Sequence, residues 1–326
     1  MCGLIRGDRL GESDSFTGER SDPNWRNLTL GLATGNGPFL GQTVGAPRML
    51  HSIEGGCELA DTAEYRYQHF STKLLFKDLR FHGGSKRPGD ALPEFDLPTT
   101  EGERITTQDL VGDQPLLLVT GSMTCPMTAS AIPSLKRLHA QWGDDVAFVM
   151  LNVREAHPGE NYPQPETPEE KINHARALKD TYQMPWTVAV DNLDGPLHIA
   201  MDAKPNSAYL IDSDGKIVFR SIWARDEGSI GRALEDVKRD KAPAKKESRA
   251  MVRPLVSAMG SVHEVMRRAG PQAERDHWLA NPPMELAGRV ASLFRPLPPD
   301  WRGVAAVATL GTVTVLILAV LLFLFL

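Results

Sequence analysis

Strand-like and helix-like patterns alternate through the middle of the chain, between residues 88 and 237. Short apolar runs bounded by turn residues predict buried strands at 116–120, 146–153 and 187–191. Longer stretches with helical spacing predict helices at 126–142, 167–182 and 227–239. A β-hairpin is expected at 208–220, turning near Asp214 and Gly215. This order of elements predicts an α/β fold, a mixed sheet flanked by helices.

The segments on either side of this core have other patterns. Residues 1–57 are rich in Gly, Ser, Asn, Asp and Pro without periodicity, and we expect them to be largely disordered. Residues 58–85 contain a helical pattern, ending at Gly83-Gly84, that packs on or leads into the core. Residues 239–302 combine Lys/Arg-rich and Pro-rich pieces with short helices, and we interpret them as a membrane-proximal connector.

The last segment, 303–326, carries no charge and is long enough to cross about 30 Å of hydrocarbon as a helix. Trp301 and Arg302 precede it, as an interfacial aromatic and a cationic flank would. A core helix is the alternative, but such helices seldom stay apolar on every face for this length. We therefore expect a single-pass C-terminal tail anchor. Because the basic residues lie upstream of it, the main domain is expected to face the cytoplasm.

Charge and cysteine content limit the function classes. The net charge of −5 over 326 residues gives no electrostatic reason to expect nucleic-acid binding. The three cysteines, Cys2, Cys57 and Cys125, are widely spaced, which is typical of a reducing compartment and not of a disulfide framework. No Cys/His cluster has metal-ligand spacing, so we expect neither a metal nor a cofactor. The first residues lack an apolar stretch, so no secretory signal is expected there.

Cys125 stands where the apolar strand ends and the helix from Pro126 begins. The free N–H groups and positive dipole end of a helix N-terminus stabilise a thiolate over a thiol. A thiolate attacks peroxides, disulfides and halogens, so this position indicates redox chemistry. The alternative is a small buried apolar residue, because free cysteines are often buried.

Two motifs together resemble a known family. Gly121-Ser-Met-Thr-Cys125-Pro is followed, after one helix and one strand, by Glu155-Ala-His157. With Lys86-Arg-Pro-Gly-Asp and the hairpin, they resemble the thioredoxin-fold redoxins of the alkyl hydroperoxide reductase and thiol-specific antioxidant type. The chain is most similar to the iodothyronine deiodinase branch and its bacterial relatives. The resemblance covers about 86–238 and implies a thioredoxin-like redoxin domain there.

The resemblance implies roles for residues and also shows departures. It places Cys125 at the family's nucleophile, and His157 and Glu155 at residues implicated in proton transfer and substrate handling. The family often has a second cysteine where this chain has Met123, and a further family histidine has no clear counterpart near Gln164. Cysteine also replaces the selenocysteine of many members.

The candidate helpers each have an alternative interpretation. His157, after a buried strand, is a general acid for a leaving group, or an exposed loop residue. Glu155 orients His157, or is a solvated acid at a strand end. Thr128 bonds the thiolate, or lies on the helix surface. Ser122 and Thr124 orient the loop, or donate a hydrogen bond to the attacked atom. Pro205 lies where thioredoxin folds keep a cis-proline.

Three hypotheses follow. The first is a membrane-anchored thiol oxidoreductase in which Cys125 attacks a small electrophile, a peroxide or disulfide. An external thiol such as glutathione or thioredoxin then resolves the product, because no second cysteine lies nearby. The second is a deiodinase-like reductive dehalogenase. The third is a non-catalytic, membrane-tethered sensor or scaffold with an ordinary, slowly reacting thiol.

Overall fold

The computed structural model describes residues 65–325. The expectations for residues 1–57, and for Cys2 and Cys57, lie outside the described residues. The same holds for the first part of the helix expected at 58–80.

The central sheet has six strands in the order β5-β4-β3-β6-β7-β8. These strands are β3 (Leu116–Gly121), β4 (Ala147–Asn152), β5 (Thr187–Val190), β6 (Ala208–Ile211), β7 (Ile217–Ser221) and β8 (Glu247–Ser248). β3, β4 and β5 are parallel, whereas β6 is antiparallel to both β3 and β7. The mixed α/β sheet expected from the sequence is confirmed.

Both faces of the sheet are covered, as the uninterrupted apolar run of β3 requires. Leu117 and Val119 face a core built with α4 (Pro126–Trp142), α5 (Pro168–Tyr182) and α7 (Glu227–Lys238). The alternate residues, Leu116 and Leu118, face a second core. That side is covered by α6 (Pro196–Ala200), β1 (Asp96–Pro98), β2 (Arg104–Thr106) and α3 (Thr107–Leu110).

The helix described near the start of this region, α2, spans Thr72–Asp78 and is shorter than the pattern predicts. Ser71 caps it, because its side chain accepts a hydrogen bond from Leu74 N at 3.5 Å. A capping residue with extended backbone ends the helical pattern on its N-terminal side.

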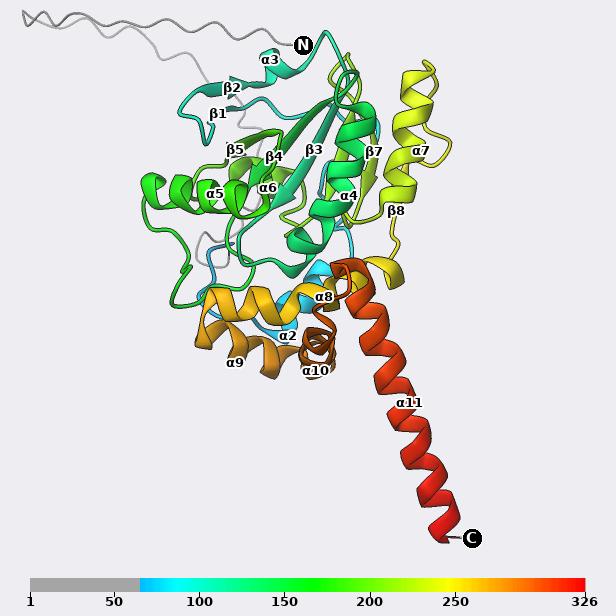
Figure 1. The fold of residues 1–326 in the computed structure, drawn as a ribbon. Helices are drawn as coiled ribbons and strands as arrows, with labels where there is room; N and C mark the ends of the chain where they lie inside the picture. Colours follow the sequence, from blue (N-terminus) through cyan, green and yellow to red (C-terminus); the bar gives the residue numbers. More distant parts are fainter. Residues whose placement is uncertain (1–64, 326) are drawn as a thin grey trace, which may run out of the picture. The chain divides into compact units, whose positions relative to one another are not determined.

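The segment expected to be a connector forms helices that pack on the redoxin domain. They are α8 (Val252–Ala269), α9 (Pro271–Ala280), α10 (Pro282–Ala291) and the short η1 (Ser292–Phe294). We call α8–α10, residues 252–291, the helical cap. Figure 1 shows it at the end of the sheet where β3 stops and α4 begins. It is fixed there in part by Asn161, whose N–H donates to the carbonyl of Ala269 at 2.9 Å.

The last helix, α11 (Pro299–Phe325), is long and apolar enough to cross a membrane, by length and composition. Its first turn is attached to the rest of the molecule. Asp300 forms an ion pair with Arg225 at 3.0 Å. Gly303 lies so close to the Val256 carbonyl of α8 that any Cβ would collide with it. The first turns of α11 therefore pack on α8 of the cap.

Candidate active site

Cys125 is the N-cap residue of α4, as the strand-to-helix transition predicts. Its Sγ accepts a hydrogen bond from Thr128 N at 3.4 Å. The side chain is 2% exposed and packs among Ile222, Trp223 and Ala258 of the cap and the neighbouring loop. The sulfur therefore lies at the N-terminus of α4, as expected, and apolar side chains also cover it.

This burial corrects the expectation of a resting thiolate. Burial raises the pKa of the Cys125 thiol to about 11, against the hydrogen bonds from Thr128, which act to lower it. The sequence shows the helix N-terminus but not the cap, and desolvation outweighs the helix terminus. At neutral pH Cys125 is a thiol, and reaction requires a base or an opening of the cap.

A small cavity of about 60 Å³ lies beside Cys125. Its wall is mainly apolar and combines α2, the Cys125 loop, the His157 loop and the cap. The lining includes Phe70, Leu79, Met127, Trp223, Leu255 and Met284. Four polar side chains also reach it: Asp78, His157, His277 and Asn281. An apolar site with a few converging polar groups is the usual form of a small-molecule site.

His157 faces this cavity and is 7% exposed, so the exposed-loop interpretation is wrong. Its ring centre lies 4.1 Å from that of Phe70 and 5.2 Å from that of His277. Its Nδ1 is buried without a hydrogen-bond partner. Burial, with the charge of His277, holds the pKa of His157 well below its usual value, so this imidazole is neutral at pH 7.

Glu155 is 1% exposed and does not bond to His157, which corrects both interpretations made from the sequence. Its Oε2 accepts from the backbone N–H and the hydroxyl of Thr124, at 2.9 and 2.7 Å. Its Oε1 pairs with His174 Nδ1 at 3.1 Å. The Thr124 hydroxyl in turn accepts from His157 N at 3.1 Å. Glu155 therefore fixes the backbone on which Cys125 and His157 stand.

The supporting residues lie around this loop. Thr128 is fully buried, so the helix-surface alternative is wrong, and its hydroxyl accepts from Ser122 N at 3.4 Å. The Ser122 hydroxyl accepts from Ala156 N at 3.3 Å, which ties the Cys125 and His157 loops together. Pro205 lines the cavity. Its cis isomer stays a prediction.

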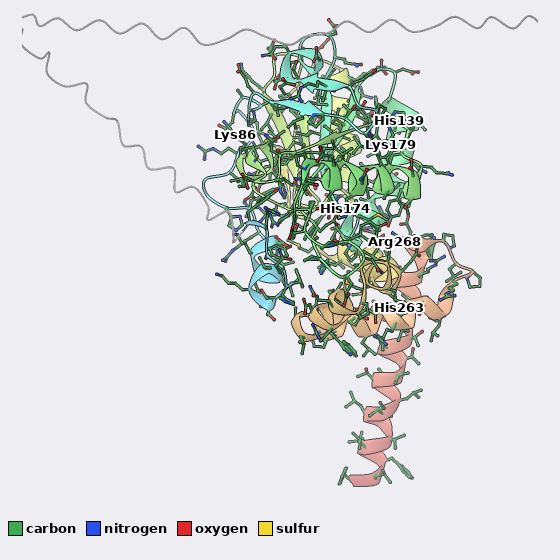
Figure 2. All side chains as sticks on the ribbon, turned by 90° about the vertical axis from the view of Figure 1, so that its left-hand side faces the viewer. Lys86, His139, His174, Lys179, His263 and Arg268 are labelled. Carbon is green, nitrogen blue, oxygen red and sulfur yellow. The ribbon has the colours of Figure 1, made fainter. Side chains whose placement is uncertain are left out.

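Sequence reasoning missed three polar residues here. Gln164 exchanges hydrogen bonds with the backbone of Glu155, at 3.0 and 2.8 Å. His174 of α5, labelled in Figure 2, lies next to the buried position Ala175. The only indication in the sequence was the place of His174 in the predicted helix, directly before a small apolar residue. His277 lies in the segment 239–302, which the sequence indicates to be a connector, and no pattern there predicts a site residue.

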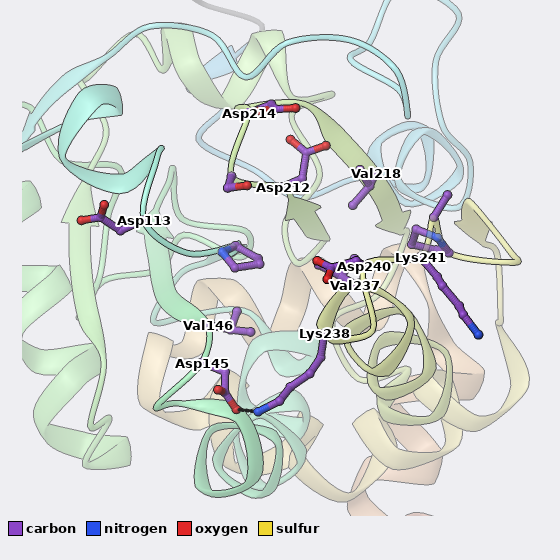
Figure 3. Close-up of a pocket in the computed structure, with 14 residues that line it drawn as sticks. Asp113, Asp145, Val146, Asp212, Asp214, Val218, Val237, Lys238, Asp240 and Lys241 are labelled. Carbon is purple, nitrogen blue, oxygen red and sulfur yellow. Dashed lines mark hydrogen bonds and ion pairs between the residues drawn. The ribbon is translucent and has the colours of Figure 1, made fainter.

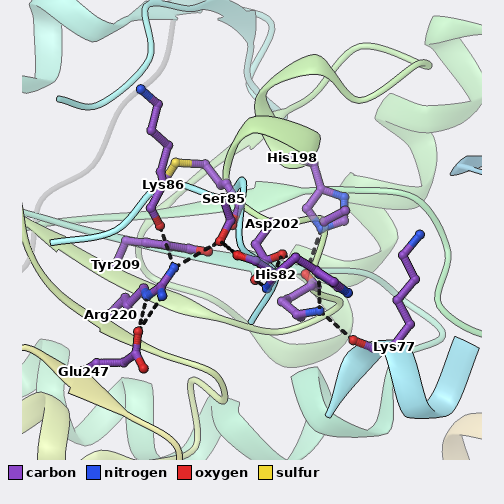
Figure 4. Close-up of polar contacts among 12 residues, drawn as sticks. Lys77, His82, Ser85, Lys86, His198, Asp202, Tyr209, Arg220 and Glu247 are labelled. Carbon is purple, nitrogen blue, oxygen red and sulfur yellow. Dashed lines mark hydrogen bonds and ion pairs between the residues drawn. The ribbon is translucent and has the colours of Figure 1, made fainter. Parts of the chain in front are cut away.

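A second polar network includes Lys77, His82 and Asp202 (Figure 4). Lys204 is buried, and its Nζ donates to the carbonyl of Lys77 at 2.8 Å. Asp202 pairs with His82 Nδ1 at 2.6 Å. These contacts fix the end of α2 and the segment that follows it against the domain.

A larger cleft, of about 600 Å³, lies at the opposite edge of the sheet, where β3 and β4 begin (Figure 3). Several aspartates line it, and Lys238 forms an ion pair with Asp145 there. Across residues 65–325, no group of three or more His, Cys, Asp or Glu side chains is placed to hold a metal ion.

The chain matches a model of a known protein family. The family model for iodothyronine deiodinase matches residues 65–237. The chain belongs to the iodothyronine deiodinase family. Members of this family share the thioredoxin-like redoxin fold, and the cap at 252–291 lies beyond the matched residues.

Individual relatives are distant. Thioredoxin-like protein YneN of Bacillus subtilis is 25% identical over 129 residues, covering 40% of this chain and 68% of that protein. Thyroxine 5-deiodinase of Sparus aurata is 26% identical over 118 residues. This match covers 33% of the present chain and only 43% of the deiodinase.

Two solved structures are similar to part of this chain. An uncharacterized conserved protein from Geobacillus kaustophilus has a TM-score of 0.43 and 21% identity, covering 49% of this chain and 87% of its own. Peroxidoxin BcpB from Mycobacterium tuberculosis has a TM-score of 0.37 and 14% identity, covering 47% and 97%.

Proposed function

We propose that the protein is a membrane-attached, thiol-dependent oxidoreductase in which Cys125 is the sole nucleophile. The observation that carries the proposal is the small cavity that Cys125 and the buried His157 line together, with His157 Nδ1 left without a hydrogen-bond partner. Within residues 65–325 no second cysteine accompanies it. An apolar chamber with one thiol and a neutral imidazole supports nucleophilic chemistry that excludes water.

The cavity size favours a hydroperoxide as the electrophile. The Sγ–H of Cys125 reacts with R–O–O–H to give Cys125 Sγ–OH and R–OH; the S–O bond forms as the O–O bond breaks. Sulfur loses two electrons and the peroxide gains them. The neutral His157 donates a hydrogen bond to the oxygen that leaves.

An external thiol completes the cycle. A first R′–SH displaces water from the sulfenic acid and leaves a mixed disulfide; a second R′–SH releases R′–S–S–R′ and restores Cys125. Glutathione or thioredoxin is too large for about 60 Å³, so this half-reaction requires part of the cap to move.

Attachment to a membrane through α11 is part of the proposal. From Gly303 onward the helix has no charged side chain, and exposed large apolar side chains also occur on α9, α10 and η1: Trp278, Leu279, Leu286 and Leu293. Flotation of the full chain with liposomes tests this. Leu318→Arg is expected to abolish flotation, and unchanged flotation of that variant would count against the anchor.

The function itself is tested with Cys125→Ser. Wild-type protein is expected to consume an added thiol when hydrogen peroxide is supplied, and Cys125→Ser is expected to consume none. Serine keeps the size and the N-cap hydrogen bond, so circular dichroism serves as the fold control. Equal turnover by the variant would refute the proposal.

Reductive dehalogenation is a second candidate, favoured by the family match over residues 65–237. The cavity, of about 60 Å³, is small for an iodinated diphenyl ether, and cysteine is a weaker nucleophile toward iodine than selenocysteine. Iodide release from an iodinated phenol, with a dithiol as co-substrate, separates this reaction from peroxide reduction.

A further inference from the structure

The helical cap brings a second histidine to the Cys125 cavity. His277 of α9 lines the cavity together with Cys125 and His157. It is 4% exposed, and its ring meets that of His157 edge to face at 5.2 Å. In a space of about 60 Å³, any occupant that touches Cys125 lies beside this imidazole.

A carboxylate holds His277 in place. Glu285 of α10 is fully buried, and its Oε2 pairs with His277 Nδ1 at 2.9 Å. Its Oε1 accepts from Arg289 Nε at 3.1 Å. A carboxylate at Nδ1 favours the tautomer with the proton on Nδ1 whenever the ring is uncharged, and this tautomer has its lone pair on Nε2.

The position of Glu285 is fixed by close helix packing. Gly288, one turn further along α10, packs on α8 so tightly that a Cβ there would lie 2.8 Å from Val262. α8 in turn packs on α4, the helix that Cys125 caps. A chain of close helix contacts, α10 on α8 and α8 on α4, therefore links the Glu285 carboxylate to the helix that Cys125 caps.

A structural role alone is a poor account of this pair. Two apolar side chains would join α9 to α10 without the cost of burying a carboxylate. His157 Nδ1, on the ring that meets His277, has no hydrogen-bond partner, so the pair does not serve to satisfy it. What the pair adds to the cavity is a second imidazole, oriented by a carboxylate, whereas burial lowers the pKa of His157 and makes that imidazole a weak base.

We propose that His277, positioned by Glu285, is the catalytic base and acid of the Cys125 site, supplied by helices outside the family-matched residues. Nε2 takes the Sγ proton as sulfur attacks the hydroperoxide, and it returns that proton to the departing oxygen to form R–OH. His157 donates a hydrogen bond to the same oxygen. The proton that leaves Sγ ends on R–OH, and the two electrons that sulfur loses go to the peroxide, so the step is balanced.

This role rests on the proposed peroxide reduction and is tested on the full-length protein with hydrogen peroxide. Substitution His277→Ala is expected to lower kcat/KM for peroxide about 10²-fold. Added imidazole is expected to restore at least about a tenth of the kcat/KM that the substitution removes. With substituted imidazoles, the restored rate should rise with the basicity of the added base, which a simple filling of the hole would not produce. Glu285→Gln keeps the hydrogen bond without the charge and is expected to lose about tenfold.

The matched control is His69→Ala. His69 also pairs with a carboxylate of α9, Asp276, at 2.8 Å, but it is largely exposed and does not line the cavity. Its rate should equal that of the wild type. If His277→Ala is misfolded by circular dichroism, His277→Gln replaces it in the same series.

Two outcomes separate the proposals. An active wild type with His277→Ala and His277→Gln at full rate overturns the role of His277 and leaves the proposed function standing. An inactive wild type overturns the proposed function and the role with it. Rescue that is independent of the basicity of the added imidazole also overturns the role, because it marks His277 as packing.

Discussion

Behind the Cys125 loop, Thr124, Glu155 and His174 form a buried polar cluster in which both carboxylate oxygens are bonded. In front of the loop, Cys125 and His157 face an apolar cavity, and His157 Nδ1 is bonded to nothing. The two regions share a backbone, since Thr124 and Cys125 are neighbours in the chain. The difference indicates a division of labour: the bonded side positions the loop, and the side with free polar atoms is available for chemistry.

The largest effect on stability is expected on the bonded side. Glu155→Ala leaves the Thr124 N–H and the His174 ring buried without their acceptor, and should cost about 3–5 kcal/mol of unfolding free energy. Urea denaturation measures this. The control is Glu101→Ala, whose partner Lys179 is near the surface, with a cost of at most about 1 kcal/mol. Equal losses in the two variants would contradict the positioning role of Glu155.

On the cavity side, Asp78 should make stability depend on pH. Burial raises its pKa to about 6, with Arg154, Lys204 and Lys77 opposing, from an ordinary value of 3.8. The fold therefore favours the protonated form. Its contribution is complete below about pH 3.8 and is lost as the pH rises through about 6.

Comparison with Asp78→Asn isolates this contribution. Between pH 4 and 7, the wild type should lose about 3 kcal/mol of unfolding free energy relative to the variant, at about 1.4 kcal/mol for each unit of pKa shift. Denaturation curves at a series of pH values give the difference. Parallel pH profiles would contradict the burial of a costly carboxylate in this wall.

The smallest effect on stability is expected at His157. His157→Phe keeps the ring that packs on Phe70 and removes a nitrogen that bonds nothing, so unfolding free energy should change by less than about 1 kcal/mol. Peroxide turnover should nevertheless fall by about 10²-fold. A large loss of stability with unchanged turnover would contradict this division, because His157 would then act in stability and not in the reaction.

Much of the fold can be predicted from local patterns. The period of apolar residues predicts β3, β4 and β5, and Thr167-Pro-Glu-Glu predicts the start of α5, where the capping box is confirmed. The N-cap position of Cys125 follows from one strand-to-helix junction. Each of these depends on residues within one turn or one strand, which is why sequence alone suffices.

The rest depends on contacts between distant segments. The cover over Cys125 comes in part from Ile222, Trp223 and Ala258, about 100 or more positions later, and no local pattern shows that α8 packs on α4. Glu155 and His157 are two residues apart, which suggested a mutual bond. At the end of a strand the alternation of side chains is lost, and Glu155 turns to Thr124 and His174 instead.

The most direct measurement of the central claim is the rate of Cys125 alkylation by iodoacetamide against pH, on the full chain with Cys2→Ser and Cys57→Ser. A thiol buried under the cap, with its pKa raised to about 11, should react slowly at pH 7 and faster with each pH unit up to about 10, without a plateau. A fast reaction that reaches its plateau below pH 8 would show an exposed, already ionised thiolate and would contradict the account.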